Sequence, residues 1–374
     1  MNLLVYSERL AQFRYGEDHP FKPLRAKLFF ELLQRYTLIG PEDIVLEPFA
    51  REEEILLLFH EREYVDALRR AETEYSLETY RRGIGTEDNP VFKGMFEFSL
   101  LCASATLEAA EKVALEGARL AFCPTAGFHH AERGRAFGFC YVNDVAIAGR
   151  YLLDRGYRIA ILDIDAHHGN GVQDAFYEED RVLTISIHES GATLFPGTGS
   201  EEEIGSGRGY GFNVNIPLAA GTGDEAYLFA FESIVPPLLY SFQPQVLFAL
   251  LGCDTHRHDP LSHLNLSASA YRRLIERISG LSGHILALGA GGYNIFKTAA
   301  MWTIAWASLL GRKIEDPYTG LVGGMMYGPE IDIARLSEEV FEGPLDERER
   351  CMHWAERVVR WIREHVFPIH GLTS

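Results

Sequence analysis

The stretch that decides the fold is RIAILDIDAHHGNGVQDAF, residues 158–176. Its first part, Ile159 to Ile164, is an almost continuous apolar run broken by one aspartate. A short run of this kind, bounded by turn residues, is typical of a strand buried on both faces of a parallel sheet. The run leads directly into aspartate, histidine and glycine residues, and ligands bind at the carboxyl ends of the strands in such sheets. We therefore expect residues 163–170 to carry the function.

Similar short runs and helical patterns alternate along the rest of the chain. Further strands are predicted at Ala121 to Cys123, Val182 to Ile187, Val246 to Leu251 and Ile285 to Leu288. Amphipathic helices are predicted at 91–116, 268–278 and 298–310, and a last one near 346–365 places Trp354, Val358, Trp361 and Ile362 on one packing face. The alternation predicts an α/β fold with a central, mainly parallel sheet flanked by helices.

Composition favours one globular domain over two. The 374 residues are 47% hydrophobic and 24% charged, a balance that supports a substantial core. No stretch reads as a flexible linker and no repeat stands out, so we expect one domain over residues 1–374. Its motifs lie between about residues 14 and 310, and a helical tail follows at about 345–366.

Charge and cysteine content limit the partners and the compartment. A formal net charge of −18 disfavours nucleic acid and anionic membranes as partners. The N-terminus lacks a signal-peptide pattern and no segment is apolar enough to span a membrane, so we expect a cytoplasmic protein. The five cysteines form no CxxC pair, which is typical of reduced thiols.

Asp163, Asp165 and His167 follow the central strand at alternate positions and therefore face the same way. Buried carboxylates must be paired or bound to metal; the alternative is that they cap backbone amides or pair with arginine. Asp254, after another strand, is a plausible third metal ligand in space. Two oxygen donors and one nitrogen suit Zn²⁺, and also Fe²⁺, Co²⁺ or Mn²⁺. Such an ion polarises a carbonyl and lowers the pKa of bound water toward ~7.

Three further residues complete a hydrolytic site. His129 and His130 lie in a loop after a strand, where they can supply the base and the acid that amide hydrolysis needs. Tyr293 follows the glycine-rich turn at 289–292 and could donate to an oxyanion, unless it is only a packed ring. His188 is interpreted as a structural residue. Neither His188 nor His168 has a neighbour in the sequence comparable to the His129–His130 pair.

Several long motifs together resemble the histone deacetylase superfamily, including its bacterial acetoin-utilisation and acetylpolyamine amidohydrolase branches. They read GFHHAERGRAFGFCYVND, LDIDAHHGNGVQDAF, LFPGTG, GCDTHRHDPLSHLNLS and GAGGYN, in this order, with HPFKPLR and EDNPVFKGMFEF before them. The resemblance implies an arginase-like fold and a zinc-dependent amidohydrolase. By motif position Asp165, His167 and Asp254 look like the metal ligands. His129 and His130 look like the tandem catalytic histidines, with Asp163 orienting His129 and His130 as the likelier base.

The same resemblance implies roles for residues around the pocket. Tyr293 matches the oxyanion-stabilising tyrosine, and Arg25 matches an arginine that lines an internal acetate channel. The substrate-binding positions are the rim aspartate, the aromatic walls and an adjoining glycine: Asp88, Phe139, Phe195 and Gly138. A structural potassium site is implied around Asp163, Asp165, His167, Ser186 and Ile187.

One position departs from many relatives, which have an aspartate where this chain has Asn170, the expected partner of His130. A neutral amide can orient the ring but does not raise its pKa as a carboxylate does. We expect a deacetylase acting on acetyl-lysine in proteins or on acetylated polyamines through a metal-bound water. A non-catalytic acyl-lysine binding protein is the alternative, and Tyr293 argues against it. A dinuclear ureohydrolase would need further metal-facing carboxylates.

Overall fold

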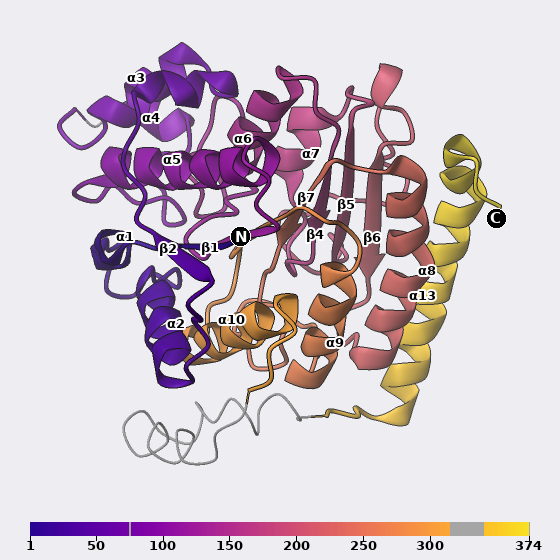
Figure 1. Ribbon diagram of the computed structural model, residues 1–374. Coiled ribbons are helices and arrows are strands. Elements are labelled where there is room, and N and C mark those ends of the chain that lie inside the picture. The colour runs from indigo at the N-terminus through magenta and orange to yellow at the C-terminus, as the bar shows by residue number, and fades with distance from the viewer. Residues whose placement is uncertain (75, 315–339, 374) are drawn as a thin grey trace.

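The computed structural model describes residues 1–74, 76–314 and 340–373. Within them one eight-stranded sheet runs in the order β2-β1-β3-β8-β7-β4-β5-β6, and every neighbouring pair is parallel (Figure 1). The strands are β1 (Asn2–Val5), β2 (Asp43–Leu46), β3 (Leu120–Cys123), β4 (Ile159–Asp163), β5 (Val182–Glu189), β6 (Asn213–Leu218), β7 (Val246–Leu250) and β8 (Ile285–Leu288). The predicted fold class, a mainly parallel α/β sheet, is confirmed.

Helices cover both faces of this sheet (Figure 1). The α-helices are α1 (Glu8–Gln12), α2 (Leu24–Arg35), α3 (Arg62–Arg70), α4 (Leu77–Arg81), α5 (Met95–Ala114), α6 (Asp144–Leu153), α7 (Asn170–Phe176), α8 (Asp224–Phe242), α9 (Ala268–Ser279), α10 (Ile295–Leu309) and α13 (Leu345–His365). Short 3₁₀ helices are η1 (Glu53–Leu58), η2 (Gly207–Gly209) and η4 (Phe367–His370). Helices α5, α6 and α7 lie on one side, while α2, α10, α9 and α8 lie on the other, with α13 packed along α8 and β6.

The central strand shows why the apolar run is nearly continuous. Ala160 and Leu162 belong to one hydrophobic cluster, whereas Ile159 and Ile161 belong to the other. Because side chains alternate between the two faces of a strand, a strand with helices on both sides needs apolar residues at every position. The first polar side chain of the run, Asp163, stands where β4 ends.

The five predicted strands and four predicted helices are all present, with ends that differ by up to a few residues. The segment predicted as a helix at 91–116 is helical only over α5, because Gly94 adopts a left-handed conformation that starts the helix there. Strands β1, β2 and β6 were not predicted, nor were the bounds of helices α1, α2, α3, α4, α6, α7 and α8. Strand β6 contains Pro217 and α8 contains Pro236 and Pro237, which obscure both patterns.

The last predicted helix is present as α13. Val358 and Ile362 are fully buried in it, and Trp354 and Trp361 pack against the same core while partly exposed, as predicted. Among the described residues no helix is both long enough and apolar enough to cross a bilayer.

Candidate active site

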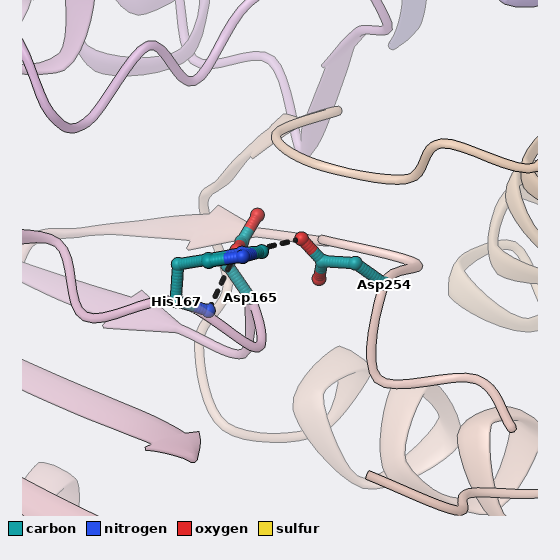
Figure 2. A group of neighbouring side chains, drawn as sticks. All are labelled: Asp165, His167 and Asp254. Atoms are coloured by element: carbon teal, nitrogen blue, oxygen red, sulfur yellow. Dashed lines mark hydrogen bonds and ion pairs between the residues drawn. The ribbon is translucent and has the colours of Figure 1, made fainter. Parts of the chain in front are cut away.

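Asp165, His167 and Asp254 converge just beyond the carboxyl ends of β4 and β7, as Figure 2 shows. Nδ1 of His167 lies 3.1 Å from Oδ1 of Asp165 and 3.0 Å from Oδ2 of Asp254. All three side chains are buried, and one ligand atom from each lies within 4.8 Å of the others. The structure thus brings together the three residues that the sequence assigns to the metal.

Backbone amides hold the two carboxylates in place. Oδ2 of Asp165 accepts from the amide of Gly291 at 2.6 Å, and Oδ1 of Asp254 accepts from the amide of Ala166 at 2.8 Å. Each carboxylate is therefore tethered to a neighbouring strand end, which fixes the direction of its remaining lone pairs.

The electrostatics of this group fit a cation. Burial, and then the proximity of Asp165, raises the pKa of Asp254 to about 8. Burial alone would lower the pKa of His167, but its bonds to the two carboxylates raise that pKa well above the ordinary value. Without a cation the cluster therefore retains protons, which a divalent ion held by the two carboxylates and the imidazole would replace.

The tandem histidines stand beside this group, in the loop that follows β3. Nδ1 of His129 lies 2.6 Å from Oδ2 of Asp163, and the Nε2 atoms of His129 and His130 are 3.1 Å apart. Nδ1 of His130 lies 2.7 Å from Oδ1 of Asn170, the first residue of α7. Because Oδ1 can only accept, His130 carries its proton on Nδ1, and its unprotonated Nε2 is an acceptor that lies beside Nε2 of His129.

The two rings are driven toward opposite protonation states. Burial lowers the pKa of His129, but the charges of Asp163 and Asp165 outweigh burial and raise it to about 9. Burial, together with the charges of His129 and His167, lowers the pKa of His130 well below 6.5. A protonated and a neutral imidazole side by side are suited to act as acid and base, respectively.

Asp144 and Asn143, for which no role was predicted, hydrogen-bond to the backbone of the loop that carries His129 and His130. The Asp144 carboxylate accepts from the amides of Gly127 at 2.9 Å and Phe128 at 2.7 Å. Nδ2 of Asn143 donates to the carbonyl of Ala131 at 3.0 Å. Both residues begin α6 and are fully buried. In the sequence they appear only as the last two residues of the motif GFHHAERGRAFGFCYVND.

A cavity of about 220 Å³ leads to the metal group and the histidines. Its lining comprises Asp88, His130, Gly138, Phe139, His167, Leu194, Phe195, Leu261 and Tyr293. The structure thus places every predicted substrate-binding residue on this cavity. Leu194 and Leu261 were not predicted, although both lie within quoted motifs.

The tyrosine lines the same cavity. The Tyr293 ring lies edge to face with Phe139 and His167, with centroids 5.6 and 6.1 Å apart. Desolvation, and then the charges of Asp165 and Asp254, raises the pKa of its hydroxyl well above 10, so the hydroxyl is a proton donor at neutral pH.

Side-chain hydrogen bonds fix the backbone at Tyr293 and in the turn before it. The Tyr293 amide donates to Oδ2 of Asp259 at 2.7 Å, and Oδ1 of the same carboxylate accepts from the Leu261 amide at 3.0 Å. Arg25 is buried and donates to the carbonyls of Gly292 at 2.7 Å and Ala290 at 2.6 Å. Arg25 thus lies beneath the tyrosine turn. Asp259 was not predicted from the sequence.

The remaining candidates lie behind the cavity. Ser186 and Ile187 are on β5, where Ser186 is in register with Asp163. The Ser186 hydroxyl contacts Nδ1 of His188 at 2.8 Å. His188 is fully buried and packs against His168 with ring centroids 4.8 Å apart, in agreement with a structural role for His188.

Three comparisons with known proteins point to one family. The histone deacetylase domain model matches residues 19–309. The acetoin utilization protein AcuC of Staphylococcus aureus is 38% identical over 327 residues, 85% of this chain and 84% of the relative. AcuC of Bacillus subtilis is 38% identical over 323 residues, covering 83% and 82%. The crystal structure of an HDAC homolog from Aquifex aeolicus superposes with a TM-score of 0.82 at 31% identity, covering 96% of this chain and 100% of the other.

Proposed function

Because this chain belongs to the histone deacetylase family, in its bacterial AcuC-like branch, we propose that it is a metal-dependent hydrolase of acetylated amines. Membership of the family supports hydrolytic deacetylation. One observation carries the finer proposal: His130, His167 and Tyr293 line one cavity, with Asp165 and Asp254 in contact with His167 and His129 in contact with His130. A protein that only binds acyl-lysine would need no such set of proton donors and acceptors.

Asp165, His167 and Asp254 are the residues that would hold the ion. Their two oxygens and one nitrogen fit Zn²⁺, and Fe²⁺ or Co²⁺ is compatible with the same donors. When bound, such an ion supplies Lewis acidity, which activates the acetyl carbonyl and a water molecule. We also propose the implied structural potassium site at Asp163, Asp165, His167, Ser186 and Ile187.

The chain's own residues then move the protons. His130 accepts the proton of the attacking water at Nε2, since its Nδ1 proton is committed to Asn170. His129, which Asp163 keeps charged, supplies the proton that the leaving amine needs. The Tyr293 hydroxyl donates to the carbonyl oxygen as negative charge develops there.

The substrate is an acetylated amine on an extended chain. Phe139 and Phe195 line the cavity and would flank the methylenes, while exposed Asp88 stands at the rim, where a peptide backbone or a second amine can donate to it. Acetyl-lysine in proteins and acetylated polyamines both meet these requirements. Arg25, buried and bonded to the carbonyls of the turn before Tyr293, would line a route for the released acetate.

An acetate-release screen on the zinc-loaded protein tests the proposal. Acetyl-lysine peptides and acetylated polyamines are compared for wild type, His130→Ala and the control His353→Ala, which removes an exposed imidazole on α13. We expect release by wild type and the control, and a loss of ~10²-fold or more in kcat for His130→Ala. No acetate from any substrate with wild type would refute the deacetylase, and an active His130→Ala variant would refute the assigned base.

A further inference from the structure

The turn that presents Phe139 to the cavity has an unusual backbone. Phe137 and Cys140 exchange both backbone hydrogen bonds, at 3.0 and 2.9 Å, so Gly138 and Phe139 form a two-residue hairpin turn. Both central residues have positive φ, 52° at Gly138 and 66° at Phe139. Turns of this kind favour asparagine and glycine, because a Cβ crowds the backbone in the left-handed region.

The two positions differ in what they require. A Cβ at Gly138 would lie 2.6 Å from Cδ2 of His130, so a glycine is needed there. At Phe139 glycine would suit the backbone better, and yet a phenylalanine is present with its ring on the cavity wall. Backbone strain of this kind persists where the surrounding structure holds it and the side chain serves the site.

Tyr15 holds the strained residue through its carbonyl. The Tyr15 hydroxyl donates to the Phe139 carbonyl at 2.9 Å, and the Tyr15 side chain is buried in an aromatic cluster. Its ring centroid lies 4.9 Å from that of His19, 4.8 Å from that of Phe92 and 5.4 Å from that of Tyr141. The hydroxyl therefore has a fixed direction, and the bond restrains the turn.

His19 connects the same wall to the rim. Its Nδ1 accepts from the Phe21 amide at 3.1 Å, so the ring proton is on Nε2, which donates to the Asp88 carbonyl at 3.1 Å. The His19 ring also lies edge to face with Phe139, with centroids 4.7 Å apart at 73°. One buried side chain thus contacts both the residue that lines the wall and the residue that stands at the mouth.

We propose that Tyr15 and His19 are positioning residues that hold the Phe139 ring and Asp88 in place to grip an extended chain entering the cavity. They thereby set the preference of the cavity for substrates with a long methylene linker. They do not affect the metal group and the catalytic residues, which form the reacting end of the cavity. The inference rests on the proposed function for the identity of the substrate, but the restraint on the wall is a property of the described contacts.

Two ligands with the same metal-binding group separate the wall from the reacting end. Acetohydroxamate reaches only the metal group, whereas a hydroxamate on a hexyl chain also passes the wall. Their affinities are measured by calorimetry on zinc-loaded wild type, Tyr15→Phe and His19→Gln. The matched control is Tyr157→Phe, which deletes a hydroxyl bonded at the same 2.9 Å to a backbone carbonyl, that of Ala114, remote from the cavity. Melting temperatures are recorded for all four proteins.

We expect Tyr15→Phe to lower the affinity for the hexyl hydroxamate about three- to tenfold, the range for one lost hydrogen bond. The affinity for acetohydroxamate should not change. His19→Gln should show the same selective loss, and Tyr157→Phe should show none. The inference would be overturned if both variants bound the hexyl hydroxamate as wild type does, or if they lost equal affinity for both ligands. It would also be overturned if Tyr157→Phe showed the same loss, or if wild type bound the hexyl hydroxamate no more tightly than acetohydroxamate. Because binding needs no turnover, a protein that binds selectively but releases no acetate would refute only the proposed function.

Discussion

Asn170→Asp is the most informative single substitution, because it introduces a charge beside His130 at the cost of one long hydrogen bond, 3.5 Å from Nδ2 of Asn170 to the His130 carbonyl. Oδ1 of Asn170 lies 2.7 Å from Nδ1 of His130, and aspartate has nearly the same shape. A carboxylate there stabilises the charged imidazolium and therefore raises the pKa of His130. If His130 must be neutral to act as the base, the acidic limb of the pH profile must move to higher pH.

The neighbouring ring indicates the magnitude. His129 is equally buried and bonded at 2.6 Å to the Asp163 carboxylate; although burial lowers its pKa, that pKa is raised to about 9. His130, bonded to an amide, has a pKa well below 6.5, chiefly because of burial. An opposite charge at hydrogen-bond distance shifts a pKa by about 1 to 3 units, and each unit corresponds to about 1.4 kcal/mol.

The assay is kcat/KM for acetate release as a function of pH, since this parameter reports the ionisations of the free enzyme. The control Asn170→Ala removes the orienting amide without adding charge, so it should lower the rate and produce no upward displacement of the acidic limb. For Asn170→Asp we expect that limb to rise by about 1 to 3 pH units. A limb that stays in place or moves to lower pH would show that Asn170 and His130 are not the titrating partners.

Four further substitutions and one control test the remaining assignments. Asp165→Ala or Asp254→Ala should abolish both metal content and activity, because two protein ligands do not complete the site; stoichiometric metal in both variants would contradict the ligand set. Tyr293→Phe should lower kcat by ~10² to 10³ with KM, melting temperature and metal content little changed, and an undiminished kcat would exclude the oxyanion role. Asp259→Asn should lower kcat about tenfold or more. Asp224→Asn, which also loses a carboxylate bond to a backbone amide, should lower only the melting temperature; equal effects on kcat in the two variants would remove Asp259 from the site.

The sheet could be predicted where its strands are buried on both faces. The runs that became β4, β7 and β8 are apolar at nearly every position, because helices cover both sides of the central strands. Strand β2 lies at the edge of the sheet, and its Ile44 and Val45 are more than two-fifths exposed. A short half-exposed strand leaves no such pattern, which explains why the edge was missed.

The polar residues at the reacting end of the cavity could also be predicted from the sequence. Asp165, His167 and Asp254 stand directly after predicted strands, and parallel strands bring their carboxyl ends to one edge. Polar residues at that edge have no use in packing, so each one is conspicuous in the sequence. His130 and Tyr293 follow strands β3 and β8 and were found in the same way.

Two residues that hold the site, Asp259 and Tyr15, could not be predicted, and the reason lies in what they bond to. Asp259 accepts from the amide of Tyr293, and the Tyr15 hydroxyl donates to the carbonyl of Phe139. Nearly every residue has the same backbone amide and carbonyl, so the sequence does not show which residue's backbone group a side chain will bond to. The positions become specific only after folding brings segments far apart in sequence into contact. It follows that two chains with the same cavity motifs can differ in how firmly the walls are held, and substrate preference can then differ between relatives whose catalytic residues are identical.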